Sequence, residues 1–366
     1  MTNNTKISIT NERGYKHNKH RIAVVMLNYN DKSNIENAVD SLLIQDYQNF
    51  KIIVIDNGSI DGSIELIKIQ YPNLTLVENS NIGYAGAYAK FLAHIFREND
   101  YAAAVLLNTD VVVERNWLSE LVKSAFSDDS IAFSQPKIFI WQKGKTDLFN
   151  TCGNKINFLG FGYCGEYKKK ESDINTSKDF ETAYASGCSL LVKREAYLKL
   201  SGLDPDFFAY LEDQDLGWRG WMYGYKSIVS VNSIMWHKYV FQKNPANKKK
   251  FFLLERNRLL FVIKNYSSKT IILLTPALFV MEIGILYHAF SNGYIKEKIT
   301  SYISFIKSIS KTLKKRKVIQ KKRILSDSEL FHRLSPTIEF DEVKSKPLKW
   351  ANKIFSKYYY FIIKFI

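Results

Sequence analysis

The chain has 366 residues with 46% hydrophobic and 14% aromatic content, which is ample for a globular core and predicts one large domain with an appendage. Its three cysteines, Cys152, Cys164 and Cys188, form no CxxC pair, which argues against a disulfide framework or a zinc site. The net charge of +16 is uneven, because residues 296–366 hold 18 Lys and Arg against 6 Asp and Glu. Such a basic tail suits an anionic lipid surface or nucleic acid. Residues 1–20 are polar, lack the apolar core of a signal peptide and are expected to form a flexible arm.

Residues 21–115 alternate apolar runs with helical patterns. Strands are predicted at 21–30, 50–59, 74–79 and 102–113, and helices at 34–45, 63–72 and 84–96. Strand and helix in alternation imply a parallel sheet with helices on both faces. We therefore predict an α/β fold with a mostly parallel central sheet flanked by helices.

Polar side chains occur where three of these strands end. In open parallel sheets, ligands bind beyond the carboxyl ends of the strands. The six residues at this predicted rim are Asn28, Asn30, Asp56, Asn57, Asn108 and Asp110. Their convergence on one edge of the sheet predicts a binding site there.

Two rim segments allow both a structural and a functional interpretation. IDNGSIDGS, residues 55–63, suits a turn before a helix, in which Asp56 either only shapes the turn or accepts hydrogen bonds from a base or ribose. In LLNTDVVVERNW, residues 106–117, Asp110 either caps a turn or holds a divalent metal ion that neutralises a diphosphate. These residues alone leave both alternatives open.

The strongest signal is YLEDQDLGWRGW, residues 210–221, where three carboxylates stand within four positions beside aromatic residues. Acids at a helix N-terminus stabilise it by about 0.3–1 kcal/mol each, which explains one or two of them but neither a third nor the aromatic setting. A carboxylate beside apolar walls has its pKa raised toward the range of a general base. We therefore predict a catalytic site at Glu212, Asp213 and Asp215, with Trp218 among the aromatic walls.

Six segments, in order, resemble the family 2 glycosyltransferases of the GT-A fold, specifically their rhamnosyltransferase-like branch. They are VVMLNYN, IDNGSIDGS, NSNIGYAGAYAKF, LLNTDVVV, SGCSLLVKREAY and GLDPDFFAYLEDQDLGWR. The resemblance implies a GT-A domain over 21–266 that transfers a sugar, with inversion, from a nucleotide-diphosphate sugar to a saccharide acceptor. It also implies dTDP-rhamnose or a UDP-hexose as donor, a divalent metal ion (Mn or Mg), and a place in surface polysaccharide or glycan synthesis.

The resemblance assigns roles to residues at matching positions. Asp213 matches the catalytic base, with Glu212 and Asp215 positioning the base or the acceptor. Asp110 closes the counterpart of the metal-binding DxD motif. His237, a lone histidine whose role its own sequence leaves open, matches a histidine that completes the metal site in several relatives. The implied contacts to the donor nucleotide are Asn28, Asn30, Asp56, Asn57, Gly83 and Asn108.

The chain departs from the DxD motif at one position. Asn108 stands where the first aspartate is usual, so the motif reads NTD. This leaves fewer negative charges for a metal ion, and Asp110 becomes the residue most expected to bind it.

Residues 267–366 are predicted to form a helical, basic, membrane-associating extension. IILLTPALFVMEIGILYHAF, residues 271–290, is long enough to span a bilayer, but it contains a proline, a glutamate and a histidine. A single span would also separate the transferase body from the lysine-rich tail, although both are expected on the cytoplasmic side. We therefore expect an interfacial or buried helix, lysines attracted to anionic lipid, and KYYYFIIKFI as a shallow anchor.

This membrane interpretation predicts a cytoplasmic protein, peripheral on the inner face of the cell membrane, with a polyprenyl-diphosphate-linked acceptor. Arg256 and Arg258 are candidates for contacts to its phosphates. The alternative, in which the C-terminal helices pack on the body with their lysines solvated, stays open.

Two rival classes are a catalytically inactive sugar-binding relative and a basic nucleic-acid-binding protein. The presence of Asp56, Asp110 and Asp213 argues against the first. The body has no basic stripe with interleaved aromatics, so no nucleic-acid partner is expected.

Overall fold

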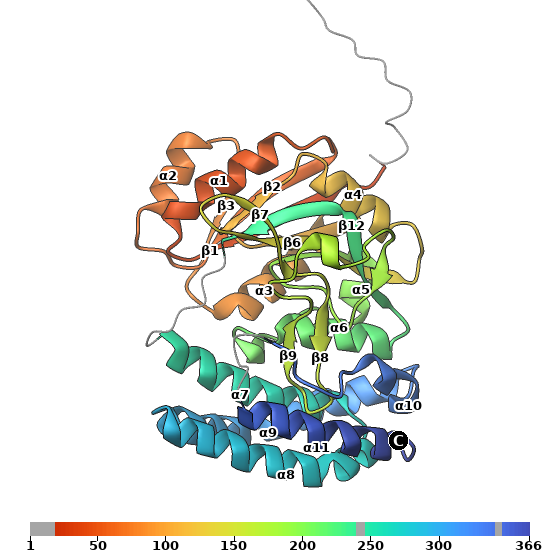
Figure 1. Ribbon diagram of the computed structural model, residues 1–366. Coiled ribbons are helices and arrows are strands. Elements are labelled where there is room, and N and C mark those ends of the chain that lie inside the picture. Colours follow the sequence, from red (N-terminus) through yellow and green to blue (C-terminus); the bar gives the residue numbers. More distant parts are fainter. Residues whose placement is uncertain (1–18, 239–245, 341–345) are drawn as a thin grey trace, which may run out of the picture.

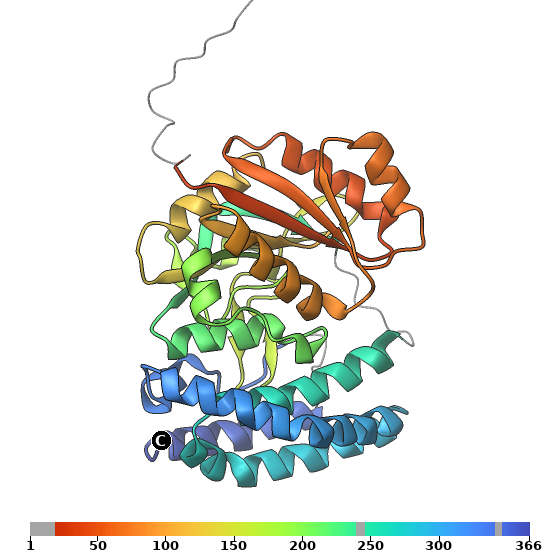
Figure 2. The ribbon, with the colours of Figure 1, turned by 180° about the vertical axis from the view of Figure 1, so that it is seen from behind.

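The computed structural model describes residues 19–238, 246–340 and 346–366 (Figure 1). Apart from its last two residues, the predicted N-terminal arm, 1–20, lies outside the described residues. A central sheet with helices on both faces forms one end of the molecule, and a layer of long helices forms the other, as the two opposite views show (Figures 1 and 2).

The first half of the sheet is parallel, as the alternating pattern predicts. Its strands lie in the order β4-β1-β2-β3, and all three neighbouring pairs are parallel. The elements of this half are β1 (Ile22–Asn28), α1 (Lys32–Leu43), β2 (Phe50–Asp56), α2 (Ser63–Gln70), β3 (Thr75–Glu78), α3 (Gly83–Glu98) and β4 (Ala103–Leu107). The strand predicted over 102–113 is two strands, because the chain turns after Leu107 and continues as β5 (Val111–Val113), which pairs with β12.

The second half of the sheet is mixed rather than parallel. Strand β11 lies between β4 and β6 and runs antiparallel to both, whereas β12 runs parallel to β6. The strands of this half are β6 (Ile131–Trp141), β7 (Lys145–Thr151), β10 (Phe180–Glu181), β11 (Ser189–Lys193) and β12 (Lys226–His237), and a separate hairpin is formed by β8 (Asn154–Ile156) and β9 (Gly162–Cys164). The helices are α4 (Trp117–Ala125), η1 (Glu171–Asp173), α5 (Arg194–Lys199), η2 (Pro205–Phe207) and α6 (Glu212–Met222).

Two hydrophobic cores lie on opposite faces of the sheet. Alternate residues of β1 divide between them: Ile22 and Val24 pack with α1 and α4, whereas Ala23 and Val25 pack with α3. This division follows from the two-residue period of a strand, and it explains why β1 reads as a continuous apolar run. The α3-side core continues through α6 into the C-terminal helices.

The helical layer consists of α7 (Ala246–Asn265), α8 (Ser268–Ser291), α9 (Ile295–Lys322), α10 (Asp327–Leu330), η3 (Phe331–Arg333) and α11 (Lys346–Ile362). Helix α7 falls before the boundary predicted at residue 266, yet it packs in this layer against α9 (Figures 1 and 2). Arg258 of α7, Glu282 of α8 and Lys298 of α9 form an ion-pair network in which Arg258 and Lys298 are at most 1% exposed. Three helices are thus joined by ion pairs whose two cations are buried.

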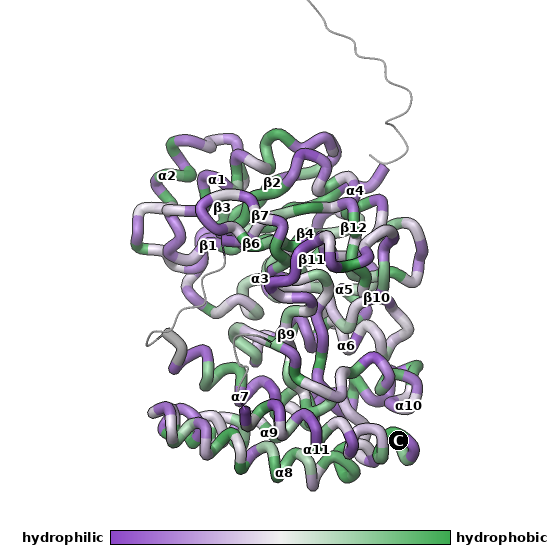
Figure 3. The backbone as a smooth tube through the Cα atoms, viewed as in Figure 1, coloured by the Kyte–Doolittle hydropathy of each residue, from purple (hydrophilic) through white to green (hydrophobic). Residues whose placement is uncertain are grey.

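Helix α8 is long and apolar enough to cross a membrane by length and composition, with a mean hydropathy of 2.0. It nevertheless lies along α9 and α11 rather than apart from them (Figure 1). Figure 3 shows its hydrophobic residues at the outer edge of the layer.

The network gives the helical layer a specific acid sensitivity. Burial alone would raise the pKa of Glu282, but Arg258 and Lys298 lower it to about 2. A carboxyl group with a depressed folded-state pKa stabilises the protein above its unfolded-state pKa, and this stabilisation disappears as the pH falls through the folded-state value.

We expect Glu282→Gln to lower the free energy of unfolding by about 3 kcal/mol at pH 6 and to have almost no effect near pH 2, as measured by chemical denaturation across this range. The matched control is Glu78→Gln, whose partner Lys68 and own side chain are both more than half exposed, and which should change little at any pH. A Glu282→Gln difference that persists undiminished at pH 2 would contradict the assignment.

Candidate functional site

The side chains that end β1 and β2 bind each other inside the protein. Asn28 and Asp56 are neighbours in the parallel register, and both are fully buried. Asn28 Nδ2 donates to Asp56 Oδ2 at 2.7 Å, and Asp56 Oδ1 accepts from the backbone N–H groups of Gly58 and Ser59. The pair therefore shapes the turn after β2 from within, and a direct hydrogen bond from Asp56 to a base or ribose does not match this geometry.

Two other residues predicted to contact the donor nucleotide lie on the same turn. Asn30 is exposed, has a φ of 52°, and its Oδ1 accepts from the backbone N–H of Ile60 at 2.8 Å. Asn57 is 3% exposed, and its Oδ1 accepts from the backbone N–H of Ile82 at 3.3 Å. Asn57 thus joins the turn after β2 to the start of α3, and Asn30 is the member of this set that faces solvent.

Gly83 begins α3 at a point where no side chain fits. Its φ is +79°, and a Cβ there would lie 2.5 Å from the carbonyl oxygen of Phe208. The first turn of α3 also binds this carbonyl, because the Ala85 N–H donates to it at 3.0 Å. In this structure Gly83 therefore serves the close approach of α3 to the segment that precedes α6.

The two predicted metal ligands are brought together from distant parts of the chain. His237 Nε2 lies 3.1 Å from Asp110 Oδ2, and its Nδ1 lies 3.2 Å from Asn150 Oδ1. Burial alone would raise the pKa of Asp110, but the charge and hydrogen bond of His237, together with Asn108, lower it. Burial alone would lower the pKa of His237, but Cys188 and Asp110 raise it well above its usual range.

The donor atoms of this pair suit a divalent ion. With Nδ1 donating to Asn150, Nε2 of His237 keeps a lone pair, and the side chain of Asp110 is 30% exposed. Among the described residues, no group of three or more His, Cys, Asp and Glu side chains that could hold a metal converges. An ion here would therefore have two protein ligands and depend on water or substrate oxygens for the rest.

The three acids of α6 occupy three different environments. Asp213 is the one that stays partly exposed; Glu212 is 6% and Asp215 0% exposed. Burial raises the pKa of Asp213, although hydrogen bonds from the N–H groups of Gly187 and Gln214, both 2.8 Å, oppose the shift. Burial and the neighbouring Asp213 raise the pKa of Glu212 well above its usual range, and Glu212 Oε2 has no hydrogen-bond partner in the described structure.

Asp215 is a structural anion rather than a support for the acceptor. It pairs with Arg219 at 2.9 Å and with Lys264 of α7 at 2.8 Å, and it accepts from Asn265 at 2.9 Å. Burial alone would raise its pKa, but Arg219 and Lys264 lower it. The expectation that Asp215 positions the base or the acceptor is corrected, because its oxygens face α7 inside the core.

Trp218 is likewise a core residue. It is 0% exposed and makes edge-on ring contacts with Phe261 on α7 and with Tyr266, which directly follows α7. One turn further along α6, Trp221 is 2% exposed. The prediction that these aromatics form walls for an acceptor sugar does not hold for either ring, since both are covered by protein.

The turn at residues 186–189, in the segment SGCSLLVKREAY, connects the two halves of the site, although its sequence alone predicted no role for it. Gly187 donates its N–H to Asp213, and the next residue, Cys188, hydrogen-bonds through its thiol to His237. The backbone carbonyl of Cys188 also accepts a hydrogen bond from the backbone N–H of Asn108 at 3.0 Å. The small residues of ASGCS were the available signal: a Cβ at Gly187 would lie 3.3 Å from Asp213 Oδ2.

The segment that leads into α6 is held in an unusual conformation. Among the described non-glycine residues, eight have positive φ, and three of them are Phe208, Tyr210 and Leu211. Phe208 has φ 62° and ψ −63°, and the Ala209 N–H donates to the carbonyl of Phe207 at 2.7 Å, which makes a γ-turn of the rare, strained kind. Such residues cost about 1–3 kcal/mol each and persist only when their surroundings hold them.

The two arginines considered for phosphate contact are engaged within the protein. Arg258 is 1% exposed, and its guanidinium is paired with Glu255 and Glu282. Arg256 donates through Nη2 to the carbonyls of Asp206 and Phe207 at 2.9 and 2.8 Å. Arg258 is therefore a structural cation, which corrects its predicted role, and the contacts of Arg256 are to the segment before α6.

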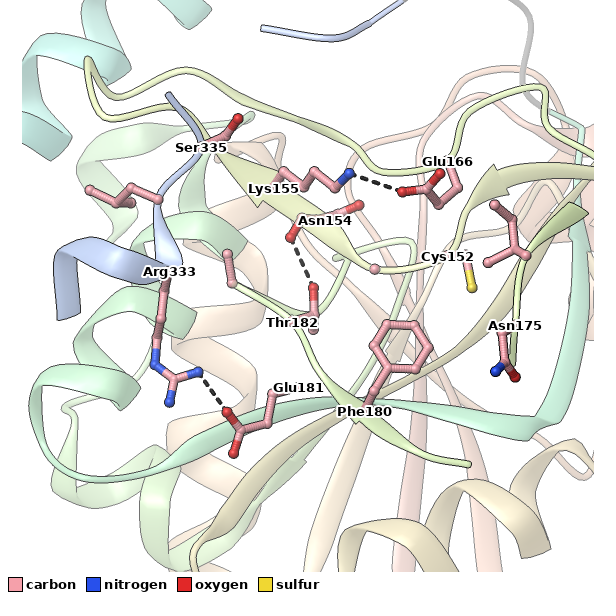
Figure 4. A pocket seen from close by; sticks show the side chains of 14 residues that line it. Cys152, Asn154, Lys155, Glu166, Asn175, Phe180, Glu181, Thr182, Arg333 and Ser335 are labelled. Atoms are coloured by element: carbon pink, nitrogen blue, oxygen red, sulfur yellow. Dashed lines mark hydrogen bonds and ion pairs between the residues drawn. The ribbon is translucent and has the colours of Figure 1, made fainter. Parts of the chain in front are cut away.

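A pocket of about 480 Å³ lies away from these residues (Figure 4). The β8 strand, the segment around β10 and the chain after η3 form its walls, and the ion pairs Lys155–Glu166 and Arg333–Glu181 lie at its edges. None of the predicted site residues lines it. The candidate site is thus the surface between Asp110, His237 and Asp213, bridged by the turn at Gly187 and Cys188.

Comparison with known proteins identifies relatives of the chain and of its fold. The sequence profile of the family described as Glycosyl transferase family 2 matches residues 23–201. An N-acetylglucosaminyl-diphospho-decaprenol L-rhamnosyltransferase of Mycobacterium tuberculosis is 23% identical over 239 residues, which cover 59% of this chain and 76% of that protein. An uncharacterized glycosyltransferase of Haemophilus influenzae is 24% identical over 123 residues, 30% of this chain and 34% of that protein.

The crystal structure of GalNAc-T7 with UDP, GalNAc and Mn2+ matches the fold with a TM-score of 0.55 at 16% identity. The match covers 69% of this chain and 49% of that chain, so this chain spans about half of the solved one. At this identity the likeness concerns the fold alone, and it confirms the GT-A architecture expected from the sequence. Residues 23–201 thus carry the glycosyl transferase family 2 signature, the chain is similar to a curated rhamnosyltransferase, and the protein is a glycosyltransferase.

Proposed function

We propose that the protein transfers a sugar, with inversion, from a nucleotide-diphosphate sugar to a saccharide acceptor, with Asp213 as the catalytic base. The observation that carries this proposal is the environment of Asp213. It is the accessible carboxylate of the α6 cluster, its pKa is raised, and the N–H groups of Gly187 and Gln214 orient its two oxygens. A raised pKa and a fixed orientation are what a general base for a sugar hydroxyl requires.

In the proposed step, the acceptor oxygen forms a bond to the anomeric carbon while the bond from that carbon to the diphosphate oxygen breaks. Asp213 takes the hydroxyl proton, and the bonding electrons leave with the nucleoside diphosphate. Single displacement from the face opposite the leaving group inverts the anomeric carbon. Glu212 is protonated in this scheme, since its pKa lies well above its usual range, and it adds no second negative charge beside Asp213.

Asp110 and His237 would hold a divalent ion, Mn or Mg, and their geometry supports this role. Such an ion would supply positive charge that stabilises the departing diphosphate. The donor nucleotide would lie along the turns after β1 and β2, where Asn30 is exposed and Asn28, Asp56 and Asn57 hold the backbone. Asn108 would act through its hydrogen bond to Asp110.

The name of the mycobacterial relative supports transfer of rhamnose to a polyprenyl-diphosphate-linked acceptor, and the proposed donor is dTDP-rhamnose, with a UDP-hexose as the alternative. A lipid-linked acceptor requires the site to reach a membrane. The outer surface of the helical layer supports such an association, on the cytoplasmic side where nucleotide sugars are made. The exposed apolar residues of the layer, each at least 38% exposed, include Ile272, Phe279, Val280, Ile283, Tyr287 and Phe290 on α8, Ile295, Ile299, Ile303 and Ile306 on α9, and Trp350, Ile354, Phe361 and Phe365 on or just beyond α11.

The packing of the layer argues that α8 lies in the plane of the membrane surface. Along α9, Lys298 and Tyr302 bind Glu282 of α8, so the two helices are fixed side by side. Between Tyr302 and Arg316, which binds Ser268 at the start of α8, α9 carries the exposed Lys307 and Lys311 alongside α8. If α8 crossed the bilayer in this packing, α9 would have to bring these charges into the hydrocarbon, at several kcal/mol each. Lysines beside exposed isoleucines instead suit the boundary between anionic headgroups and acyl chains.

The first test is Asp213→Asn, which keeps the size of the side chain but cannot accept the proton. We expect kcat to fall by about 10²- to 10⁴-fold in a radiolabelled transfer assay with dTDP-rhamnose and UDP-hexose donors, while the KM for the donor changes little. The control, Glu195→Gln on α5, should retain wild-type turnover. Near wild-type kcat in Asp213→Asn would rule out its role as the base.

The second test concerns the metal ion. We expect Asp110→Asn and His237→Gln each to weaken Mn²⁺ binding at least about tenfold, measured by electron paramagnetic resonance of free Mn²⁺, with the exposed Asp128→Asn as control. Because the pKa of His237 is raised, Mn²⁺ must displace its proton, so affinity should fall as the pH is lowered from 8 to 6. Unchanged Mn²⁺ affinity in both variants would place the ion elsewhere.

The third test concerns the membrane surface. We expect the Phe279→Ser/Phe290→Ser double variant to lower binding to phosphatidylglycerol-rich vesicles at least about tenfold in a flotation assay. The matched control is Ile60→Ser/Ile69→Ser, which removes side chains of similar exposure from the opposite end of the molecule. Failure of the wild-type protein to float with these vesicles, or equal loss in both double variants, would contradict the proposed surface.

A further inference from the structure

The segment from Asp206 to Tyr210, just before the catalytic helix, depends on two side chains of α7. Asn257 is 0% exposed, and its Nδ2 donates to the carbonyls of Phe207, Ala209 and Tyr210 at 2.9, 2.9 and 2.7 Å. Arg256 donates through Nη2 to the carbonyls of Asp206 and Phe207.

The two α7 side chains also hold each other. Arg256 donates to Asn257 Oδ1 through both Nε, at 3.0 Å, and Nη2, at 2.8 Å. This contact orients the amide of Asn257 with its NH₂ group toward the loop. The remaining carbonyl of the segment, that of Phe208, accepts from α3 through the Ala85 N–H. Every carbonyl from residue 206 to residue 210 therefore has a donor, and side chains of α7 supply the donors for four of the five.

This arrangement bears on Asp213 because the strained residues end only two positions before it. Phe208, Tyr210 and Leu211 have positive φ values, which residues with side chains rarely adopt. The carbonyl of Leu211 accepts a hydrogen bond from the backbone N–H of Asp215 and so forms part of the first turn of α6. A shift of this segment would rotate or unwind the first turn of α6. Asp213 Oδ2 would then lose the 2.8 Å contact to the Gly187 N–H that orients it.

We infer that Asn257, oriented by Arg256, is a positioning residue for Asp213. Its amide holds the strained segment in the one conformation that presents the Asp213 carboxylate to the acceptor. Asn257 itself touches neither substrate nor the reacting atoms. The inference rests on the proposed function of Asp213, which its own variant tests separately.

The test compares Asn257→Ala with Gln45→Ala. Gln45 is a matched control, because it is also a buried amide, 5% exposed, that binds three backbone groups: the carbonyls of Ser41 and Glu114 and the N–H of Leu118. It does so between α1 and α4, on the face of the sheet away from α6. Both variants should lower the Tm, but Asn257→Ala should also lower kcat at least tenfold with the donor KM within about twofold, whereas Gln45→Ala should leave kcat within about twofold.

Two further readouts separate positioning from general destabilisation. Hydrogen exchange at the backbone amides of 206–213 should accelerate in Asn257→Ala and stay unchanged in Gln45→Ala. In an Asp213→Asn background, Asn257→Ala should change the residual kcat less than about twofold, because the group it positions is already gone. The inference would be overturned if the fold-loss of kcat in the double variant equalled the product of the losses in the two single variants, or if Asn257→Ala kept the wild-type kcat.

The outcomes also distinguish this inference from the proposed function. Wild-type turnover in Asp213→Asn would contradict both the role of Asp213 as base and the inference about Asn257. An inactive Asp213→Asn together with a fully active Asn257→Ala would overturn the inference alone. If Asn257→Ala does not fold, Arg256→Met takes its place, since Arg256 is only half-buried. It should lower kcat at least about threefold with faster exchange at 206–213, and unchanged kcat in a folded Arg256→Met would overturn the inference.

Discussion

The fully buried carboxylate of Asp215 is the constraint on which the rest of the structure depends. An ionised carboxylate without a partner in a protein interior costs several kcal/mol, so its burial requires cations from other elements. Arg219 supplies one from the same helix, and Lys264 supplies the other from α7. Lys264 also binds Asp204, which in turn binds Lys315 of α9. The helical layer and the sheet domain therefore share one ion-pair network, and neither completes its electrostatics without the other.

Helix α7 carries this coupling to the candidate site. Arg258 joins it to α8 and α9, Arg256 and Asn257 bind the strained segment before α6, and Lys264 neutralises Asp215. The same helix thus contacts the layer proposed to lie on the membrane and the segment that orients the proposed base. A glycosyltransferase that acts on a lipid-linked acceptor benefits from such an arrangement, because the acceptor and the base are then positioned by one rigid element.

The acids of α6 illustrate how environment, rather than residue type, assigns roles. Two cations favour the ionised form of Asp215, burial beside another acid raises the pKa of Glu212 and favours its protonated form, and Asp213 stays accessible with a raised pKa. Three carboxylates within four positions would repel one another if all were charged. With Asp215 in ion pairs and Glu212 protonated, Asp213 would be the one unpaired negative charge of the cluster, and the three acids would no longer repel one another.

The sequence by itself determined the elements and their order. Apolar runs of strand length, helical spacing and turn residues located β1 to α3, and the rim residues and acid cluster predicted a site at the carboxyl edge of the sheet. Local chemistry suffices there, because hydrophobic period and turn geometry act over a few residues. The tertiary structure alone decided the partners: that β11 runs antiparallel, that Asp56, Trp218 and Arg258 are enclosed, and that Asn257 holds the segment before Asp213. Burial, pairing and pKa depend on residues tens of positions apart, and only folding brings those together.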